Sequence, residues 1–170
     1  MGGWDYGSKA LPIFDAVVDE LGRHGLMVIP NNHRSRGNWC CDEAHGDGLW
    51  HTPQYPESAW TEDCKFMVAR YRHRPHVIGA ELRNEIRPDP SQGLAPTWGD
   101  GDPLTDWRAA AIRGGNAVLS VNPRLLIIVG GMDYQSNLRG ARDFPVTLAL
   151  SHRLVYATHP RPPLSSLPVS

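Results

Sequence analysis

The sequence predicts an α/β fold in which parallel strands alternate with helices, as in part of a (β/α)8 TIM barrel. Four short apolar runs are separated by segments with helical periodicity, which is the pattern of βα units. Polar and ionisable residues directly follow several of these runs, and in a barrel such positions line the C-terminal face, where catalytic groups gather. No run is followed by a G-x-G-x-x-G or G-x-x-x-x-G-K-[ST] motif, which argues against dinucleotide-binding and P-loop folds.

The first half of the chain predicts two helices, each followed by a strand. Apolar residues recur at helical spacing after Ser8, a candidate N-cap, and Gly25 is well placed to end that first helix. The run at residues 26–30 is apolar on both faces, as expected of a buried parallel strand. The expected helices cover residues 11–21 and 60–71, and the second expected strand covers residues 77–82.

The second half predicts a third helix and further strands. Asp102 and Pro103 supply an N-cap and a first-turn proline for this helix, which ends at Asn122. Its apolar stripe contains Leu104, Trp107, Ala111 and Val118. Strands are expected at residues 125–129 and 153–157, with another apolar run at residues 146–150. We expect residues 1–159 to form one partial barrel domain and residues 160–170 to form an irregular tail rich in proline and serine.

Length, charge and hydropathy exclude several classes of protein. The chain has 170 residues, the size of one ordinary domain, and its 41% apolar and 21% charged residues are typical of a globular protein. A net charge of -1 gives no basic field for nucleic acid or anionic lipid. No apolar run approaches the ~20 residues that span a bilayer, and the N-terminus lacks the basic and apolar regions of a signal peptide. We therefore expect neither nucleic acid nor a membrane as a partner.

The three cysteines leave three interpretations open. A disulfide from Cys64 to either Cys40 or Cys41 is compatible with an oxidising compartment and leaves one thiol over. A zinc site could combine these cysteines with His45 and His51, but it lacks the C-x2-4-C spacing of structural zinc sites. The interpretation that we favour makes the cysteines small buried packing groups, so no metal is expected.

Glu85 is the strongest candidate for a catalytic residue. It lies within three residues of the end of an expected buried strand, beside Asn84. A partly desolvated carboxyl group at such a position can hold a proton near neutral pH and protonate a glycosidic oxygen as it leaves. The amide of Asn84 could donate a hydrogen bond to a sugar hydroxyl. The alternative is an exposed loop glutamate paired with Arg83 or Arg87.

Four segments of the chain resemble segments of a known family and occur in the same order. The segments are MVIPNNHRS with NWCCDEAHGDGLW, RNE ending at Glu85, VNPRLLIIVGGMDYQSNL, and LVYATH. Together they resemble glycoside hydrolase family 5, the cellulase-like retaining enzymes, in which an Asn-Glu pair stands at the end of a strand. The resemblance extends over residues 11–159 and implies strands three to six of an eight-stranded barrel.

The resemblance implies roles for individual residues. Glu85 matches the family's general acid/base, and Asn84 matches the residue that holds the 2-hydroxyl of the sugar at the cleavage point. His33 and His159 match two histidines that line this subsite. Trp39 is a candidate for stacking on sugar rings, although loop packing is equally compatible with it. The resemblance implies a polysaccharide or oligosaccharide substrate and no metal or organic cofactor.

Two other residues are weaker candidates. Trp50 could also stack on a sugar ring, but a core or loop-packing role fits it equally well. Asp133 follows an expected strand and could reach the cleft, although a role in a turn or cap is favoured for it.

The sequence departs from the family at the second catalytic carboxylate. A retaining glycosidase needs two carboxyl groups about 5 to 5.5 Å apart. In the family the nucleophile is a glutamate after the seventh strand, and this sequence has no glutamate after Glu85. Pro160 and Arg161 stand where the family has a tyrosine, and Ile86 replaces the proline after the Asn-Glu pair. Because a closed barrel typically takes about 250 residues, we expect a truncated copy of the domain.

Two functions are compatible with these observations. The intact parent of the chain would hydrolyse β-glycosidic bonds of a glucan or related polysaccharide with retention, and Glu85 would act first as acid and then as base. The alternative is a catalytically inactive half-barrel that at most binds sugar weakly. The localisation is left open, with secretion expected for a full-length parent.

Overall fold

The computed structural model describes residues 7–37 and 46–160. Its longer helices are α1 (Gly7–Arg23), α2 (Glu57–Arg70) and α3 (Trp107–Val121), and its strands are β1 (Gly79–Glu81), β2 (Leu126–Gly130) and β3 (Leu154–Ala157). Two short helices, α4 (Met132–Gln135) and α5 (Arg139–Asp143), follow β2, and a 3-10 turn (Ser151–Arg153) precedes β3.

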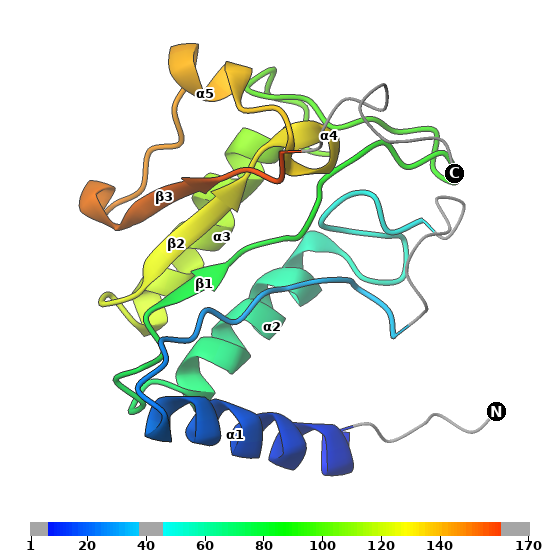
Figure 1. Cartoon of the computed structure of the whole chain (residues 1–170). Helices are drawn as coiled ribbons and strands as arrows, with labels where there is room; N and C mark the ends of the chain where they lie inside the picture. The colour runs from blue at the N-terminus through cyan, green and yellow to red at the C-terminus, as the bar shows by residue number, and fades with distance from the viewer. Residues whose placement is uncertain (1–6, 38–45, 161–170) are drawn as a thin grey trace, which may run out of the picture.

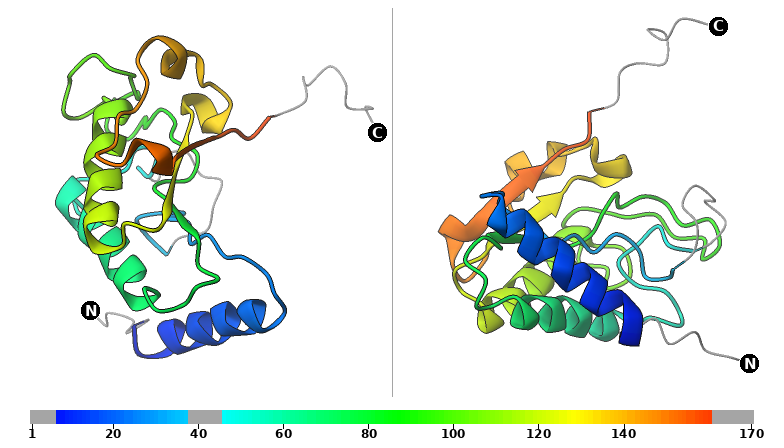
Figure 2. Two further views of the ribbon diagram at one scale, coloured as in Figure 1. Left: turned by 90° about the vertical axis from the view of Figure 1, so that its left-hand side faces the viewer. Right: turned by 60° about the horizontal axis from the view of Figure 1, so that its bottom comes forward.

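The three strands form one parallel sheet in the order β1-β2-β3. Ala80 pairs with Ile127, and Val129 pairs with Tyr156. Helices α2 and α3 pack against each other and lie along one face of the sheet, as Figure 1 and the left view of Figure 2 show. The carboxyl ends of all three strands point to the same edge of the sheet (Figure 1). This arrangement is part of a (β/α)8 barrel and agrees with the fold class that the sequence predicts.

Buried tryptophans join the two helices to the sheet. The indole of Trp107 lies between those of Trp50 and Trp60, with ring centroids 5.6 Å and 6.1 Å away. Each of the two helical indoles also donates a hydrogen bond to the sheet side: Trp60 to the carbonyl of Leu82, and Trp107 to the carbonyl of Gly130, both at 2.9 Å. The buried indoles therefore hold the main chain in place at the carboxyl ends of β1 and β2.

The segment at residues 26–30 is not the buried strand that the sequence predicts. It runs parallel to the start of the sheet, because the N–H of Val28 donates to the carbonyl of His76 at 2.8 Å and its carbonyl accepts from Ile78 at 3.0 Å. Only isolated bridges form, and Met27 and Ile29 are 72% and 43% exposed. The segment lies beside the β1 edge of the sheet, and no strand in the described residues pairs with its other edge.

The helix boundaries confirm one expected signal and correct two. Gly25 has a φ of +73°, and the N–H of Leu26 reaches back to the carbonyl of Leu21 at 3.0 Å, which ends α1 as expected. Ser8 lies inside α1 and not at its N-cap. The N-cap of α3 is Asp106, not Asp102.

Asp106 caps α3 because its carboxylate accepts from three main-chain N–H groups. These belong to Ala109 at 3.0 Å and to Gly99 and Gly101 at 2.9 Å each. The carboxylate of Asp102 accepts instead from the N–H of Leu104 in the preceding turn. Leu104, at 52% exposed, is therefore outside the helix and its apolar stripe.

The apolar run at residues 146–150 packs without forming a strand. Val146 and Leu148 are buried, and the N–H of Val146 donates to the hydroxyl of Tyr156 at 2.7 Å. The run therefore contributes side chains to the core from an irregular segment before β3.

Candidate active site

Glu85 lies on a turn just beyond β1, at the carboxyl edge of the sheet. Its main chain is in the left-handed region, with a φ of +46°. Its carboxylate is partly exposed, at 28%, and its Oε1 lies 3.1 Å from Nδ1 of His159. The carboxylate expected after β1 and the histidine expected after β3 are thus brought together by the fold.

The alternative interpretation pairs the Glu85 carboxylate with Arg83 or Arg87, but these two arginines donate hydrogen bonds to other groups. The guanidinium of Arg83 is buried and donates to Asn32 and Asp47. Arg87 donates to the main-chain carbonyl of Glu85 at 3.1 Å, and its guanidinium lies over the ring of Tyr134.

A chain of hydrogen bonds connects Glu85 to the other predicted histidine. Gln135 accepts from the N–H of Glu85 at 2.9 Å and donates to Glu81 at 2.7 Å. The second oxygen of the Glu81 carboxylate accepts from Asn31 at 2.7 Å, and the Asn31 side chain contacts Nδ1 of His33 at 3.1 Å. His33 therefore belongs to the same polar network as Glu85.

Sequence reasoning missed two members of this network, Glu81 and Gln135, and predicted for Asn31 only that it follows an expected strand. Glu81 carried a usable signal, because a carboxylate within the expected buried strand at residues 77–82 needs a partner. Gln135 carried none, since it follows a glycine-rich turn in which any polar residue would fit the pattern.

Left-handed backbone is concentrated at this site. In the described part of the chain, the four non-glycine residues with positive φ are Glu85, Asp133, Tyr134 and Gln135. The two turns that carry them touch, because the N–H of Tyr134 donates to the carbonyl of Ile86 at 3.1 Å. Such conformations cost about 1–2 kcal/mol per residue and persist where the surrounding structure enforces them, often at functional sites.

A buried ion pair supports the segment between β1 and Glu85. The side chains of Arg83 and Asp47 are 1% and 0% exposed, and Arg83 donates to Asp47 Oδ1 at 3.4 Å. Burial lowers the pKa of Arg83 to about 10, and the Asp47 carboxylate opposes this shift. Arg83 also donates to Asn32 at 2.9 Å, which ties the loop after residue 30 to the end of β1.

The remaining candidates are placed as follows. Asn84 is half-buried in the same turn as Glu85, and its N–H donates to the carbonyl of Asn32 at 3.0 Å. Trp50 is fully buried in the core and donates to Glu57, so it cannot stack on a sugar. The Asp133 carboxylate accepts from Asn137 within a turn, the role that the sequence favours. Trp39 lies outside the described residues.

The cysteine and histidine loop falls largely outside the described residues, which leave out Cys40, Cys41 and His45. Cys64 is a free, half-buried thiol that lines a cavity of about 130 Å³ between α1, α2 and β1. Nε2 of His51 contacts the carbonyl of Leu104 at 2.9 Å. Within residues 7–37 and 46–160, no three His, Cys, Asp or Glu side chains come together as metal ligands would. Over the same residues, no helix is long and apolar enough to cross a membrane.

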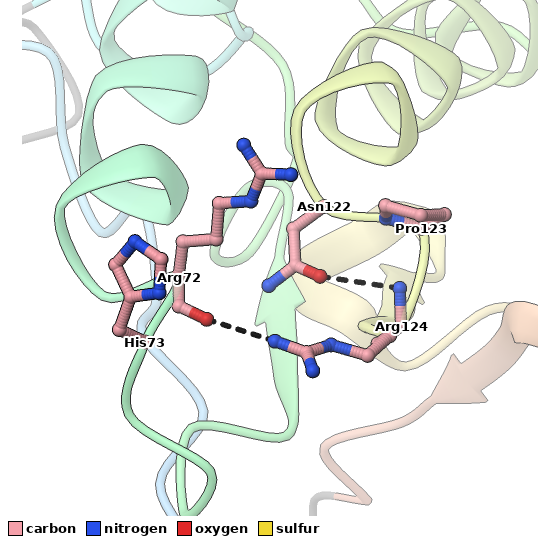
Figure 3. A pocket seen from close by; sticks show the side chains of 5 residues that line it. All are labelled: Arg72, His73, Asn122, Pro123 and Arg124. Carbon is pink, nitrogen blue, oxygen red and sulfur yellow. Dashed lines mark hydrogen bonds between the residues drawn. The ribbon is translucent and has the colours of Figure 1, made fainter.

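A second, basic pocket lies at the opposite end of the sheet. It has a volume of about 410 Å³ and is lined by Arg72, His73, Asn122, Pro123 and Arg124 (Figure 3). Arg124 donates to the main-chain carbonyl of Arg72, just beyond the end of α2, at 3.0 Å. The described residues that line this pocket include no carboxylate, the group that acid/base chemistry on a sugar would require.

The fold and the site together define a class of protein. Parallel strands are covered by helices, and a carboxylate and a histidine meet beyond the carboxyl ends of the strands. This is the arrangement of a (β/α)8-barrel enzyme, in which loops after the strands carry the catalytic groups.

Comparison with known proteins identifies the family. Residues 1–165 match the cellulase family, glycosyl hydrolase family 5. The chain is 39% identical over 164 residues to an endoglucanase from Paenibacillus polymyxa, covering 90% of this chain and 38% of that relative. It is 34% identical over 165 residues to the major extracellular endoglucanase of Xanthomonas campestris, covering 90% of this chain and 31% of that relative.

Solved structures agree with this match. The catalytic domain of the Xanthomonas campestris endoglucanase has a TM-score of 0.74 at 33% identity, covering 88% of this chain and 43% of that one. An endocellulase from Pyrococcus horikoshii, in complex with cellotetraose, has a TM-score of 0.74 at 29% identity. The match covers 92% of this chain and 48% of the endocellulase chain. The chain belongs to glycosyl hydrolase family 5, which confirms the resemblance. It spans about a third of the length of the two curated relatives.

Proposed function

We propose that this chain carries the acid/base half of a glycosidase site that cleaves β-glycosidic bonds of a glucan. Glu85 is the general acid that protonates the departing glycosidic oxygen, and then the base that takes a proton from the incoming water. His159 and Asn84 contact the same sugar, and His33 lines the subsite. The substrate is a polysaccharide or oligosaccharide, and the intact site works with retention of configuration.

The observation that carries the proposal is the meeting of Glu85 and His159. The two residues are separated by most of the second half of the chain, yet their side chains lie 3.1 Å apart at the carboxyl edge of a parallel sheet. The Glu85 carboxylate is partly exposed, so a sugar oxygen can reach it. Its main chain is held by a buried glutamine, which gives the carboxylate a defined position.

The test places this chain in a complete barrel. In a chimera, residues 1–165 replace the matching segment of the Paenibacillus polymyxa endoglucanase. We expect the chimera to release reducing ends from a β-glucan, and Glu85→Gln to lower kcat/KM by about 10²-fold or more. Glu62→Gln, at a 69% exposed carboxylate on α2, is the matched control and should keep full activity. An unchanged rate in Glu85→Gln would refute the role of Glu85.

A second function is favoured by one sequence observation: no glutamate follows Glu85. Without a second carboxylate at the right distance, the two-step retaining path has no nucleophile. We therefore expect the 170-residue chain alone to bind cello-oligosaccharides weakly without turnover. NMR titration with cellotetraose should shift the signals of Glu85 and His159, and steady glucan hydrolysis by the chain alone would contradict this expectation.

A further inference from the structure

We propose that Gln135 is a positioning residue that holds Glu85 and His159 in their working geometry. This inference rests on the proposed role of Glu85 as general acid/base. Gln135 is fully buried, yet both polar atoms of its carboxamide are hydrogen-bonded, and its main-chain carbonyl accepts from the N–H of His159 at 3.0 Å. One side chain and one peptide group thus reach both members of the pair.

The orientation of the Gln135 carboxamide is dictated by its neighbours. The Glu81 carboxylate can only accept hydrogen bonds, so it faces the Nε2 donor of Gln135 at 2.7 Å. That leaves Oε1 to accept from the N–H of Glu85 at 2.9 Å. Glu81 is itself fixed by the amide of Asn31 at 2.7 Å. Of the two amide side chains, only glutamine offers this donor and acceptor at this length, because asparagine is one methylene shorter.

The residues around Gln135 have the same left-handed backbone conformation as Glu85. Asp133, Tyr134 and Gln135 have φ values of +52°, +58° and +65°, and Glu85 has +46°. A run of three left-handed residues without glycine is costly, so contacts must maintain it. The bonds from Glu85 to Gln135 and from Tyr134 to Ile86 hold the two turns against each other.

Space for the side chain comes from the residue at the end of β2. A Cβ at Gly130 would overlap the Gln135 side chain, so glycine is required there by close approach. The carboxamide is consequently enclosed, and water cannot easily replace it as the partner of Glu85. Loss of this acceptor would leave a main-chain N–H without a partner in a turn that is already strained.

The test uses the 170-residue chain labelled with 15N and 13C and reads hydrogen bonds instead of turnover. The test therefore still decides whether Gln135 positions Glu85 if Glu85 proves not to be the acid/base. In the unmodified chain we expect a through-bond coupling between the amide nitrogen of Glu85 and the side-chain carbonyl carbon of Gln135. Gln135→Glu sets two carboxylates against each other at Glu81, so the amides of Glu85 and His159 should exchange with solvent about tenfold faster or more.

A reciprocal exchange separates positioning from general damage. Adding Glu81→Gln to Gln135→Glu returns one donor and one acceptor to the same places, so both exchange rates should return to within about twofold of the original. Gln54→Glu, at an exposed glutamine, controls for the added charge. The proposal is overturned if the coupling is absent in the unmodified chain, if Gln135→Glu leaves both amides as slow as before, or if the double variant stays as fast as the single one.

Discussion

The buried pair of Arg83 and Asp47 offers a quantitative prediction about the segment that leads to Glu85. Both side chains are almost fully buried, and Arg83 donates to Asp47 Oδ1 at 3.4 Å and to the Asp47 carbonyl at 3.2 Å. Asp47→Asn keeps the shape of the side chain and removes its charge. The Arg83 guanidinium would then be buried with neutral acceptors only, of which Asn32 at 2.9 Å is the shortest.

The size of the effect follows from the pKa of Arg83. Burial lowers it from 12.5 to about 10 even with Asp47 present, which corresponds to a cost of ~3 kcal/mol at neutral pH. The unfolded state binds the proton more tightly, so this cost is present below pH 10 and is relieved as pH rises from about 10 to 12.5. Removing one partner of a buried pair generally costs about 3–5 kcal/mol. Because neutral acceptors remain, we expect Asp47→Asn to lower the free energy of unfolding by ~3 kcal/mol.

Urea unfolding at pH 7 measures the free energy of unfolding of the unmodified chain, of Asp47→Asn, of Arg83→Met and of the double variant. The double variant should be more stable than the sum of the single effects implies, with a coupling of ~2 kcal/mol or more. Asp143→Asn, at an exposed carboxylate paired with Arg142, is the control and should change stability by less than ~0.5 kcal/mol. Purely additive effects of the two buried substitutions would refute the reasoning.

Three further predictions concern stability and the site. Burial raises the pKa of the Cys64 thiol from 9.0 to about 12, so the free energy of unfolding should fall as pH rises above about 9. Cys64→Ala should reduce this pH dependence in urea titrations, and an unchanged pH dependence would contradict the prediction. Asp106→Ala removes three capping hydrogen bonds and should lower the free energy of unfolding by ~2 kcal/mol, against clearly less for Asp102→Ala; equal losses would contradict the assignment of the cap. Gly130→Ala should cost ~1–3 kcal/mol and shift the NMR signal of Glu85, whereas Gly37→Ala, which meets open space, should do neither.

The sequence predicted the structure correctly where a local residue pattern determines the secondary structure. The apolar run at residues 125–129 became β2 at Leu126–Gly130, and the helix expected at 60–71 became α2 at Glu57–Arg70. Gly25 ends α1 because its φ of +73° suits a residue without a side chain. The sequence also placed Glu85 and His159 after expected strands, and because parallel strands end at one edge of the sheet, the two side chains lie close together.

The sequence was a poor guide where the outcome depends on distant neighbours. The run at 26–30 has the composition of a buried strand, but its exposure is set by what lies beside it in the sheet. Asp102 and Asp106 both have a capping side chain, and the fold of the loop at Gly99 and Gly101 decided between them. Gln135 became part of the site only through contacts with Glu81 and Glu85, which lie 54 and 50 residues away in the sequence.

The central claim is that Glu85 supplies and takes up the proton, and one measurement tests it most directly. In the chimera, Glu85→Ala removes the base that activates water while leaving the sugar on the enzyme accessible to a nucleophile that needs no base. With an aryl β-cellobioside as substrate, we predict slow hydrolysis that sodium azide accelerates by about tenfold or more, giving a glycosyl azide of retained configuration. Undiminished hydrolysis in this variant, or a low rate that azide leaves unchanged, would contradict the account.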